Sequence, residues 1–183
     1  MSGSFFVSQI LSKEVTDKYR LTTDELRRVL EHIAAAGFDP TPNARVGGRL
    51  TGIQWQGATL KGSDRLTSAE VHFLRHVVAN SEWPTGTTLN DYIQSIRDVI
   101  LDRRSGVIIG RYQGALQLTI IRLSGALRGP NGSPWVLVDY RIGLAHWMTA
   151  FQPPAGLSVL RSGDRESIKW LRRPRLQTGS SGV

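Results

Sequence analysis

No cysteine occurs among the 183 residues, so neither a disulfide nor a thiolate-ligated metal can hold this protein together. No apolar run approaches the ~20 residues that a membrane-spanning helix requires. The sequence also lacks a Walker A motif and a complete Gly-x-Gly-x-x-Gly, and it therefore predicts no bound nucleotide cofactor. Hydrophobic residues nevertheless make up 40% of the chain, which is typical of a protein that folds around a core.

Acidic residues are scarce in the second half of the chain. Residues 101–183 hold four Asp and Glu against 12 Lys and Arg, whereas residues 1–100 hold 11 of each class, so the C-terminal half carries the whole formal charge of +8. Eleven of the 12 cations are Arg, whose planar fork of donors matches phosphate. We therefore expect an anionic partner, with nucleic acid ahead of an acidic protein and a membrane surface. The lack of an acidic cluster in this half argues against a two-metal nuclease.

Helical patterns are confined to the first part of the chain. Apolar residues at helical spacing predict three helices, at 22–36, 67–78 and about 90–101. The first two open with capping boxes, Thr22-Thr-Asp-Glu25 and Thr67-Ser-Ala-Glu70. Between them lie a turn-rich segment at 39–48 and an alternating segment at 49–60 that favours a hairpin. We expect residues 1–60 to form a helical N-terminal delivery or processing region and residues 61–183 to form the main domain.

From Gly106 onward the pattern changes to that of β-strands. Alternating β-branched and apolar residues predict four strands, at 107–109, 116–123, 135–141 and 146–151. In the tail we expect a short helix from Asp164 to about Leu171 and a basic end. The predicted fold class is therefore α+β, with N-terminal helices followed by an antiparallel β-meander of about four strands.

Three short motifs resemble a known family. They are His76-Val77 on a helix, the small-residue turn Thr85-Gly-Thr-Thr-Leu-Asn90 that opens the next helix, and Met148-Thr-Ala-Phe-Gln-Pro153 on the last predicted strand. Together they resemble the RNase A-like C-terminal toxin domain of bacterial contact-dependent growth-inhibition proteins, within the broader group of barnase, colicin D and RelE-like ribonuclease toxins. The chain departs from the family pattern at Phe151, where a Tyr is expected, and in having no Arg shortly after His76.

The resemblance implies a function. A domain of this kind is a ribonuclease toxin that cleaves RNA, with transfer RNA as one candidate, by 2′-hydroxyl transesterification and without a metal or other cofactor. It implies secretion or delivery by a bacterium, action in the cytoplasm of the target cell during bacterial competition, and an acidic immunity protein in the producing cell. The alternative from another class is a non-catalytic nucleic-acid-binding module that uses the Arg-rich sheet and tail. A cationic protein–protein adaptor is a third possibility.

His76 is the first candidate for a catalytic residue. Imidazole exchanges protons near neutral pH, so His76 could act as the general base toward a ribose 2′-hydroxyl. The other interpretation is a packed or surface histidine. His72 lies one turn earlier and shares a helical face with His76. A zinc site at this His-x-x-x-His is disfavoured, because the Glu that follows the first His in zincins is missing and no third ligand is evident.

Thr149 is the second candidate. On a strand it shares a face with Trp147 and Phe151, so its hydroxyl could hold a phosphate oxygen while a base stacks alongside. The other interpretation is a Thr in the strand position that this residue favours. His146 borders a predicted loop and could serve as a second acid or base.

Cationic side chains are the remaining candidates. Cleavage of RNA without a metal requires positive charge beside the pentacoordinate phosphate, and Arg111 is the predicted source. Arg122 and Arg141 on the strands, with Trp170, Arg172 and Arg173 in the tail, are predicted to bind RNA. The other interpretations are a solvated sheet face for the strand residues and an unstructured basic end for the tail.

Overall fold

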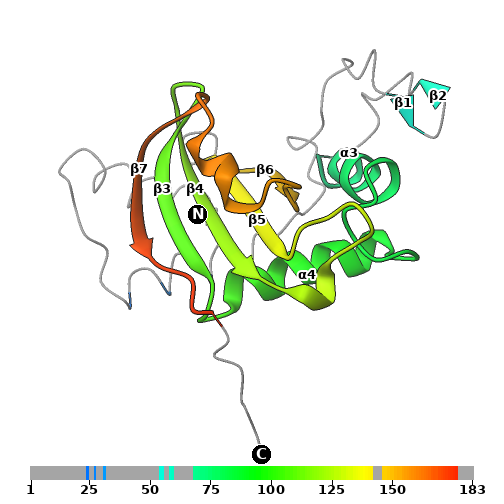
Figure 1. The fold of residues 1–183 in the computed structure, drawn as a ribbon, viewed down its shortest axis with the longest axis horizontal. Coiled ribbons are helices and arrows are strands. Elements are labelled where there is room, and N and C mark those ends of the chain that lie inside the picture. The colour runs from blue at the N-terminus through cyan, green and yellow to red at the C-terminus, as the bar shows by residue number, and fades with distance from the viewer. Residues whose placement is uncertain are drawn as a thin grey trace, which may run out of the picture.

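The computed structural model describes residues 68–141 and 146–176, together with Asp24, Arg27, Glu31 and the pairs 54–55 and 58–59. Of residues 54–55, 58–59, 68, 115–116, 141 and 146–148 it describes the backbone alone. Helix α3 (Ser68–Phe73) continues directly into a π-helical segment, η3 (Leu74–Ala79), and α4 (Leu89–Leu101) follows after a turn. Five strands follow up to residue 172, with short 3₁₀ segments after the second and the fourth of them (Figure 1).

A five-stranded antiparallel sheet forms the centre of the fold. Its strands are β3 (Gly106–Tyr112), β4 (Ala115–Leu123), β5 (Trp135–Arg141), β6 (His146–Phe151) and β7 (Arg165–Arg172). Their order across the sheet is β6-β5-β4-β3-β7, so β6 and β7 are the two edges. The α+β class and the sequence of helices before strands are confirmed, with five strands where about four were expected.

The tail prediction was wrong. Where a short helix was expected, β7 pairs antiparallel with β3, and Val107 lies opposite Arg172 while Ile108 lies opposite Trp170. Without β7, the outer edge of β3 would leave its backbone N–H and C=O groups unpaired. Ser167 has φ 54°, where the ladder is irregular, and an irregular strand of this kind gives little periodic signal in the sequence. Pairing with β3 therefore outweighs the local helical pattern.

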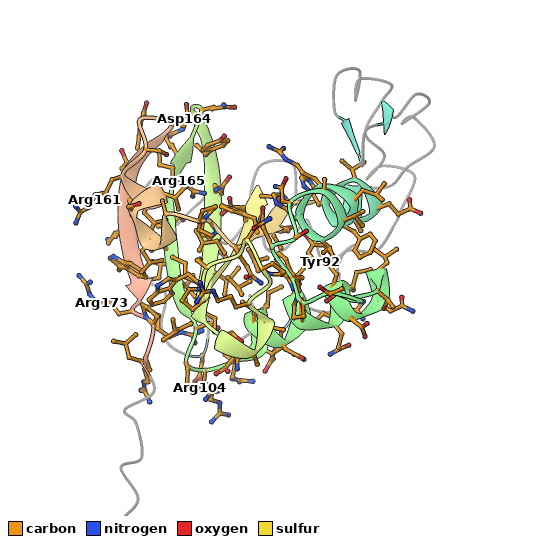
Figure 2. The ribbon with its side chains drawn as sticks, turned by 45° about the vertical axis from the view of Figure 1, so that its right-hand side comes forward. Tyr92, Arg104, Arg161, Asp164, Arg165 and Arg173 are labelled. Atoms are coloured by element: carbon orange, nitrogen blue, oxygen red, sulfur yellow. The ribbon has the colours of Figure 1, made fainter. Side chains whose placement is uncertain are left out.

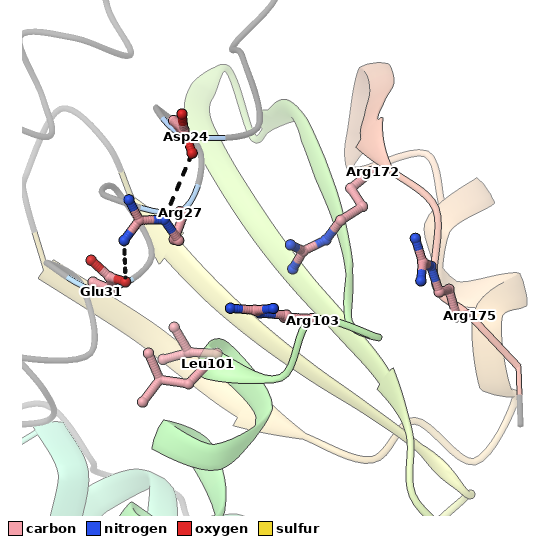
Figure 3. A pocket seen from close by; sticks show the side chains of 8 residues that line it. Asp24, Arg27, Glu31, Leu101, Arg103, Arg172 and Arg175 are labelled. Carbon is pink, nitrogen blue, oxygen red and sulfur yellow. Dashed lines mark hydrogen bonds and ion pairs between the residues drawn. The ribbon is translucent and has the colours of Figure 1, made fainter.

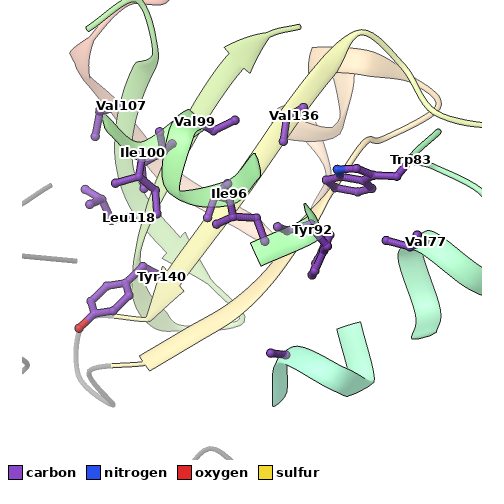
Figure 4. Packing of buried hydrophobic residues seen from close by; sticks show 14 of the residues in the cluster. Val77, Trp83, Tyr92, Ile96, Val99, Ile100, Val107, Leu118, Val136 and Tyr140 are labelled. Atoms are coloured by element: carbon purple, nitrogen blue, oxygen red, sulfur yellow. The ribbon is translucent and has the colours of Figure 1, made fainter. Parts of the chain in front are cut away.

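Two layers cover the two faces of the sheet (Figure 1). On one face, α4 packs Tyr92, Ile96, Val99 and Ile100 against alternate strand residues, which include Val107, Leu118, Val136 and Val138 (Figure 4). On the other face, the 3₁₀ segment η5 (Gly156–Arg161, orange in Figure 1) covers a smaller cluster centred on Ile108, Ile121 and Leu137. Every central strand is thus buried on both faces.

Helix α4 is fixed at its start and along its length. Thr88 and Asp91 form a capping box, in which the Thr88 hydroxyl accepts the N–H of Asp91 at 3.2 Å and the Asp91 carboxylate accepts the N–H of Thr88 at 3.0 Å. The buried Tyr92 hydroxyl donates to the carbonyl of Ala150 at 2.8 Å. This bond ties α4 to edge strand β6, next to the residues of the site.

Little of the N-terminal region is described. Asp24, Arg27 and Glu31 are helical, and β1 (Gln54–Trp55) pairs antiparallel with β2 (Ala58–Thr59), as the predicted hairpin requires. The segment 39–48 and the proposed boundary after residue 60 lie outside the described residues, so the division into two regions remains a prediction. Within the described part of the chain, no helix is long and apolar enough to cross a membrane.

Candidate active site at the edge of the sheet

The site begins in the π-helical segment η3, which carries His76. The wider turn of a π-helix re-aims side chains locally, and such turns recur at functional sites. The rings of His72 and His76 stack with 5.8 Å between centroids and an interplanar angle of 12°. The prediction that the two histidines share a face is therefore confirmed. His76 is buried, with 6% of its surface exposed.

Both ring nitrogens of His76 have hydrogen-bond partners from other elements. Nδ1 lies 2.9 Å from Oε1 of Glu82, and Nε2 lies 3.0 Å from Oγ1 of Thr149 on β6. An ionised carboxylate only accepts hydrogen bonds, so the proton of the neutral ring belongs on Nδ1. Nε2 then accepts from the Thr149 hydroxyl. The structure thus joins two of the four residues named as catalytic candidates from the sequence, and it leaves Nε2 with a lone pair that can accept a proton.

Glu82 is a residue of the candidate site that the sequence did not reveal. It is buried, and its carboxylate accepts three hydrogen bonds: Oε1 from His76 Nδ1 and from Asn80 Nδ2, each at 2.9 Å, and Oε2 from the backbone N–H of Gln152 at 2.7 Å. Both carboxylate oxygens are therefore engaged, which holds the carboxylate in one orientation. The only sequence signal was an acidic residue shortly after the predicted helix and next to Trp83.

The turn that carries Glu82 is held from two sides. On one side Trp83, 1% exposed, packs edge-on against Tyr92 of α4 and donates its indole N–H to Ser95 Oγ at 3.2 Å. On the other side, the β4–β5 connection donates backbone N–H groups to the carbonyls of Ser81 and Glu82, from Asn131 at 3.1 Å and Gly129 at 2.8 Å.

Gly129 and Gly132 allow this close approach. A Cβ at Gly129 would collide with the backbone of Trp83, and one at Gly132 would collide with the carbonyl of Glu82. The position of Glu82 therefore depends on contacts with α4 and with the β4–β5 connection, and not on the turn alone.

His72 contributes a neutral ring. Burial, with smaller effects from His76 and Arg75, lowers the pKa of His72 to about 3. Its Nδ1 atom is buried and has no hydrogen-bond partner among the described residues. On the other flank, the Phe151 ring lies 5.9 Å from that of His76. His76 is thus bordered by one uncharged imidazole and one phenyl ring.

A buried ion pair lies one strand away from Thr149. Asp139 stands opposite Thr149 in the β5–β6 ladder, so the two side chains emerge on the same face, the one that η5 covers. Asp139 Oδ2 accepts from Arg165 Nη2 at 2.9 Å, and both side chains are 6% exposed. Thr119 donates to Asp139 and accepts from Arg165 Nη1 at 3.2 Å. Burial raises the pKa of Asp139, although Arg165 opposes that shift.

Arg165 therefore differs from other arginines of the C-terminal half. Its backbone belongs to edge strand β7 and pairs with Tyr112 of β3. Its guanidinium nevertheless extends across the sheet to Thr119 on β4 and Asp139 on β5. Arg161 and Arg173 are exposed and project away from the sheet (Figure 2). Sequence patterns did not single out Arg165, since it lay in the segment expected to be helical.

The structure does not bring Arg111 to this site. Its guanidinium is exposed and donates to the carbonyl of Gly114 at 2.9 Å, at the β3–β4 hairpin. Three strand spacings, ~14 Å, separate β3 from β6, which carries Thr149. Its predicted role beside the reacting phosphate remains a prediction that this position does not favour.

Among the other predicted residues whose side chains the structure describes, Phe151 alone contacts His76. Arg122 pairs with Asp102 at 3.0 Å, and Arg173 lies over the Trp170 ring at 5.4 Å. Arg172 donates from Nε to the carbonyl of Ser105 at 2.7 Å. The backbones of Arg141 and His146 pair across β5 and β6, whereas the side chains of Arg141, His146 and Trp147 lie outside the description.

The described residues contain no group of three His, Asp or Glu side chains that could hold a metal ion. Comparisons with protein-family models, with curated proteins and with solved structures found no match for this chain. The interpretation of the site therefore depends on its own geometry.

Proposed function

We propose that the protein is a metal-independent endoribonuclease that cleaves RNA by transesterification through the ribose 2′-hydroxyl. One observation carries the proposal: the hydroxyl–imidazole–carboxylate chain formed by Thr149, His76 and Glu82. A base that lies within hydrogen-bond reach of a hydroxyl, with a carboxylate holding the far side of its ring, is the arrangement that activates oxygen nucleophiles.

In the proposed reaction, His76 Nε2 takes the proton of the 2′-hydroxyl. The 2′-oxygen then bonds to the adjacent phosphorus, and the bond from phosphorus to the 5′-oxygen breaks. The products are a 2′,3′-cyclic phosphate and a 5′-hydroxyl, whose proton comes from a general acid; His146 is the predicted donor. Glu82 stabilises the imidazolium that forms, because its carboxylate already accepts from Nδ1.

Thr149 is proposed to contact the phosphate. In the structure its hydroxyl faces His76 Nε2, the place that a substrate 2′-hydroxyl must take. Rotation of the Thr149 hydroxyl toward a phosphate oxygen would vacate the Nε2 lone pair and add a donor beside the developing charge. Phe151, which is half-buried and adjacent to His76, offers a flat surface on which a base can stack.

An anionic substrate fits the charge of the chain. The formal charge of +8 lies entirely in the half that contains the sheet and Thr149. From the resemblance to contact-dependent growth-inhibition toxins we further infer an acidic immunity partner and delivery into a target cell. These inferences rest on the sequence motifs and the charge, and the site geometry supports only the chemistry.

RNA cleavage and end-group analysis test the proposal. The purified chain is incubated with total RNA in excess EDTA, and the products are separated on a gel and treated with a phosphatase that spares cyclic phosphates. Cleavage that leaves 2′,3′-cyclic ends, lost in His76→Ala and kept in Arg161→Gln, supports the proposal. If RNA stays intact while the wild type and His76→Ala bind it equally, the non-catalytic RNA-binding alternative holds instead.

A further inference from the structure

A cationic pocket, apart from the candidate active site, lies where the C-terminal end of α4 meets β7. It has a volume of about 610 Å³, within the range of pockets that hold small ligands (Figure 3). Its lining residues are Asp24, Arg27, Glu31, Ile100, Leu101, Arg103, Arg172 and Arg175. Arg172 lies on β7, where it pairs with Val107 of β3, and β7 is the sheet edge opposite β6, which carries Thr149. Four strand spacings, ~19 Å, therefore separate this pocket from Thr149.

The two carboxylates of the pocket are already occupied. Arg27 lies 2.9 Å from Glu31 and 3.9 Å from Asp24. Asp102, which caps α4 at this end, is held by Arg104 at 2.7 Å and by Arg122 at 3.0 Å. In the part of the chain that the structure describes, the guanidinium groups of Arg103 and Arg175 have no ion-pair partner.

The fold holds the arginines in place although they repel one another. Arg172 is half-buried and donates to the carbonyls of Ser105 at 2.7 Å and Asp102 at 3.5 Å. Arg175 is anchored through its backbone N–H, which donates to the carbonyl of Arg104 at 2.8 Å. Burial lowers the pKa of Arg172; the nearby carboxylate of Asp102 opposes that shift, and the charge of Arg175 adds a smaller effect in the same direction as burial. An anion between the two side chains would offset this repulsion.

We propose that Arg103, Arg172 and Arg175 form a phosphate-binding site for a nucleotide, either free or within an RNA strand. Guanidinium forks bind phosphate oxygens in pairs, and this pocket is lined by three guanidinium groups that have no carboxylate partner there among the described residues (Figure 3). Leu101 is 52% exposed at the rim, and its side chain gives an apolar surface against which a sugar or base can lie. The site goes beyond the proposed ribonuclease activity and does not depend on it.

Calorimetric titration of the full chain tests this site with three probes that the proposed chemistry cannot cleave. They are inorganic pyrophosphate, ADP and a 2′-O-methyl oligoribonucleotide. The test variants are Arg103→Gln and Arg175→Gln, whose side chains are exposed, so that folding is retained; a thermal melt verifies this. The matched control is Arg161→Gln, an exposed arginine on η5, over the other face of the sheet.

Each test variant should bind roughly 10-fold more weakly, as expected for the loss of one charge-assisted hydrogen bond, and the control should bind like the wild type. The slope of log affinity against log salt should fall by about 1 per arginine removed. Weaker binding of pyrophosphate and ADP identifies a free-nucleotide site, whereas weaker binding of the oligonucleotide alone identifies a contact with the RNA strand. Absence of binding to the wild type, or equal binding by the test and control variants, would overturn the proposal.

Discussion

The carboxylate of Glu82 accepts the backbone N–H of Gln152 at 2.7 Å, 70 positions further along the chain. The same carboxylate accepts from His76, and Gln152 follows directly after β6, the strand of Thr149. Glu82 therefore links the His76 ring to the end of β6 and so fixes the position of that ring relative to the Thr149 hydroxyl. Few side chains could replace Glu82, because one acceptor oxygen must face His76 and a second must face the N–H of Gln152.

Glu82→Gln should show how much the proton position on His76 matters for cleavage, independently of its effect on the free energy of unfolding. An amide oxygen can still accept from Gln152, but the amide NH₂ would then face His76 and favour the tautomer with its proton on Nε2. Because Nε2 then lacks a lone pair, we expect RNA cleavage to fall by ~10²–10⁴-fold. Single-turnover cleavage and a urea melt on the same protein measure both effects.

Glu82→Ala is the matched comparison. It leaves buried donors on His76 and Gln152 without their acceptor, and each such donor costs ~1–3 kcal/mol when unsatisfied. Asn80 also loses its acceptor, but that residue is exposed and can turn to water. The Ala variant should therefore lose stability as well as rate. A Gln variant that melts like the wild type and cleaves at the full rate would show that Glu82 has no part in catalysis.

Thr149→Val and Thr149→Ser test the hydroxyl directly. Val keeps the shape but removes the donor to His76 Nε2, whereas Ser keeps the hydroxyl. If the hydroxyl contacts the phosphate in the transition state, the Val variant should lose ~10²–10³-fold in rate and the Ser variant should retain most of it. A Val variant whose only change is a lower melting temperature would restrict Thr149 to holding the ring.

His72 should make the fold sensitive to acid. Its pKa falls from the ordinary 6.5 to about 3 in the folded protein, so between these pH values the unfolded chain binds a proton that the folded chain does not bind. Stability contributed by the neutral ring is complete above pH 6.5 and is lost as the pH falls toward 3, at up to roughly 1.4 kcal/mol per pH unit.

The comparison that isolates this effect is His72→Leu, in which the titrating group is gone. Urea melts of both proteins between pH 7 and 4.5 should show the wild type losing stability faster than the variant. Parallel curves would mean that the imidazole is solvated in the folded protein.

Arg165→Met should leave Asp139 buried without its cation. We expect a loss of ~3–5 kcal/mol in the free energy of unfolding, as for other broken buried pairs. Burial already raises the pKa of Asp139, and removal of Arg165 raises it further, so the loss should grow as the pH rises through that pKa. The double variant Arg165→Met with Asp139→Asn should recover part of the stability. Equal melts for the wild type and Arg165→Met would show that the pair contributes nothing.

The sequence predicted most elements because their signals are local. Helix α4 and strands β4, β5 and β6 lie within a few residues of the predicted ranges, since capping residues, period and turn glycines act over short distances. Strand β7 was missed because only the free edge of β3, some 60 residues earlier, makes that segment a strand. A strand that forms only because a distant strand edge is available shows no periodic pattern in its own sequence.

The same distinction applies to the site. His76 and Thr149 were found through short motifs and through the chemistry of imidazole and hydroxyl groups. Glu82 and Arg165 were missed because each acts through residues far along the chain, Gln152 for one and Asp139 with Thr119 for the other. The position of Arg111, on β3 and away from His76 and Thr149, could not be predicted either, because strand residues of one charge look alike until the sheet order is known.

The most direct test of the account is the rate of RNA cleavage by His76→Ala, in EDTA, beside its thermal melt. The account predicts a folded variant whose cleavage rate is lower by ~10²–10⁴-fold, because the general base is gone, while His72→Leu cleaves at close to the wild-type rate at pH 7. A His76→Ala protein that melts normally and cleaves RNA at the wild-type rate would contradict the account, and with it the assignment of Glu82 and Thr149 as its partners.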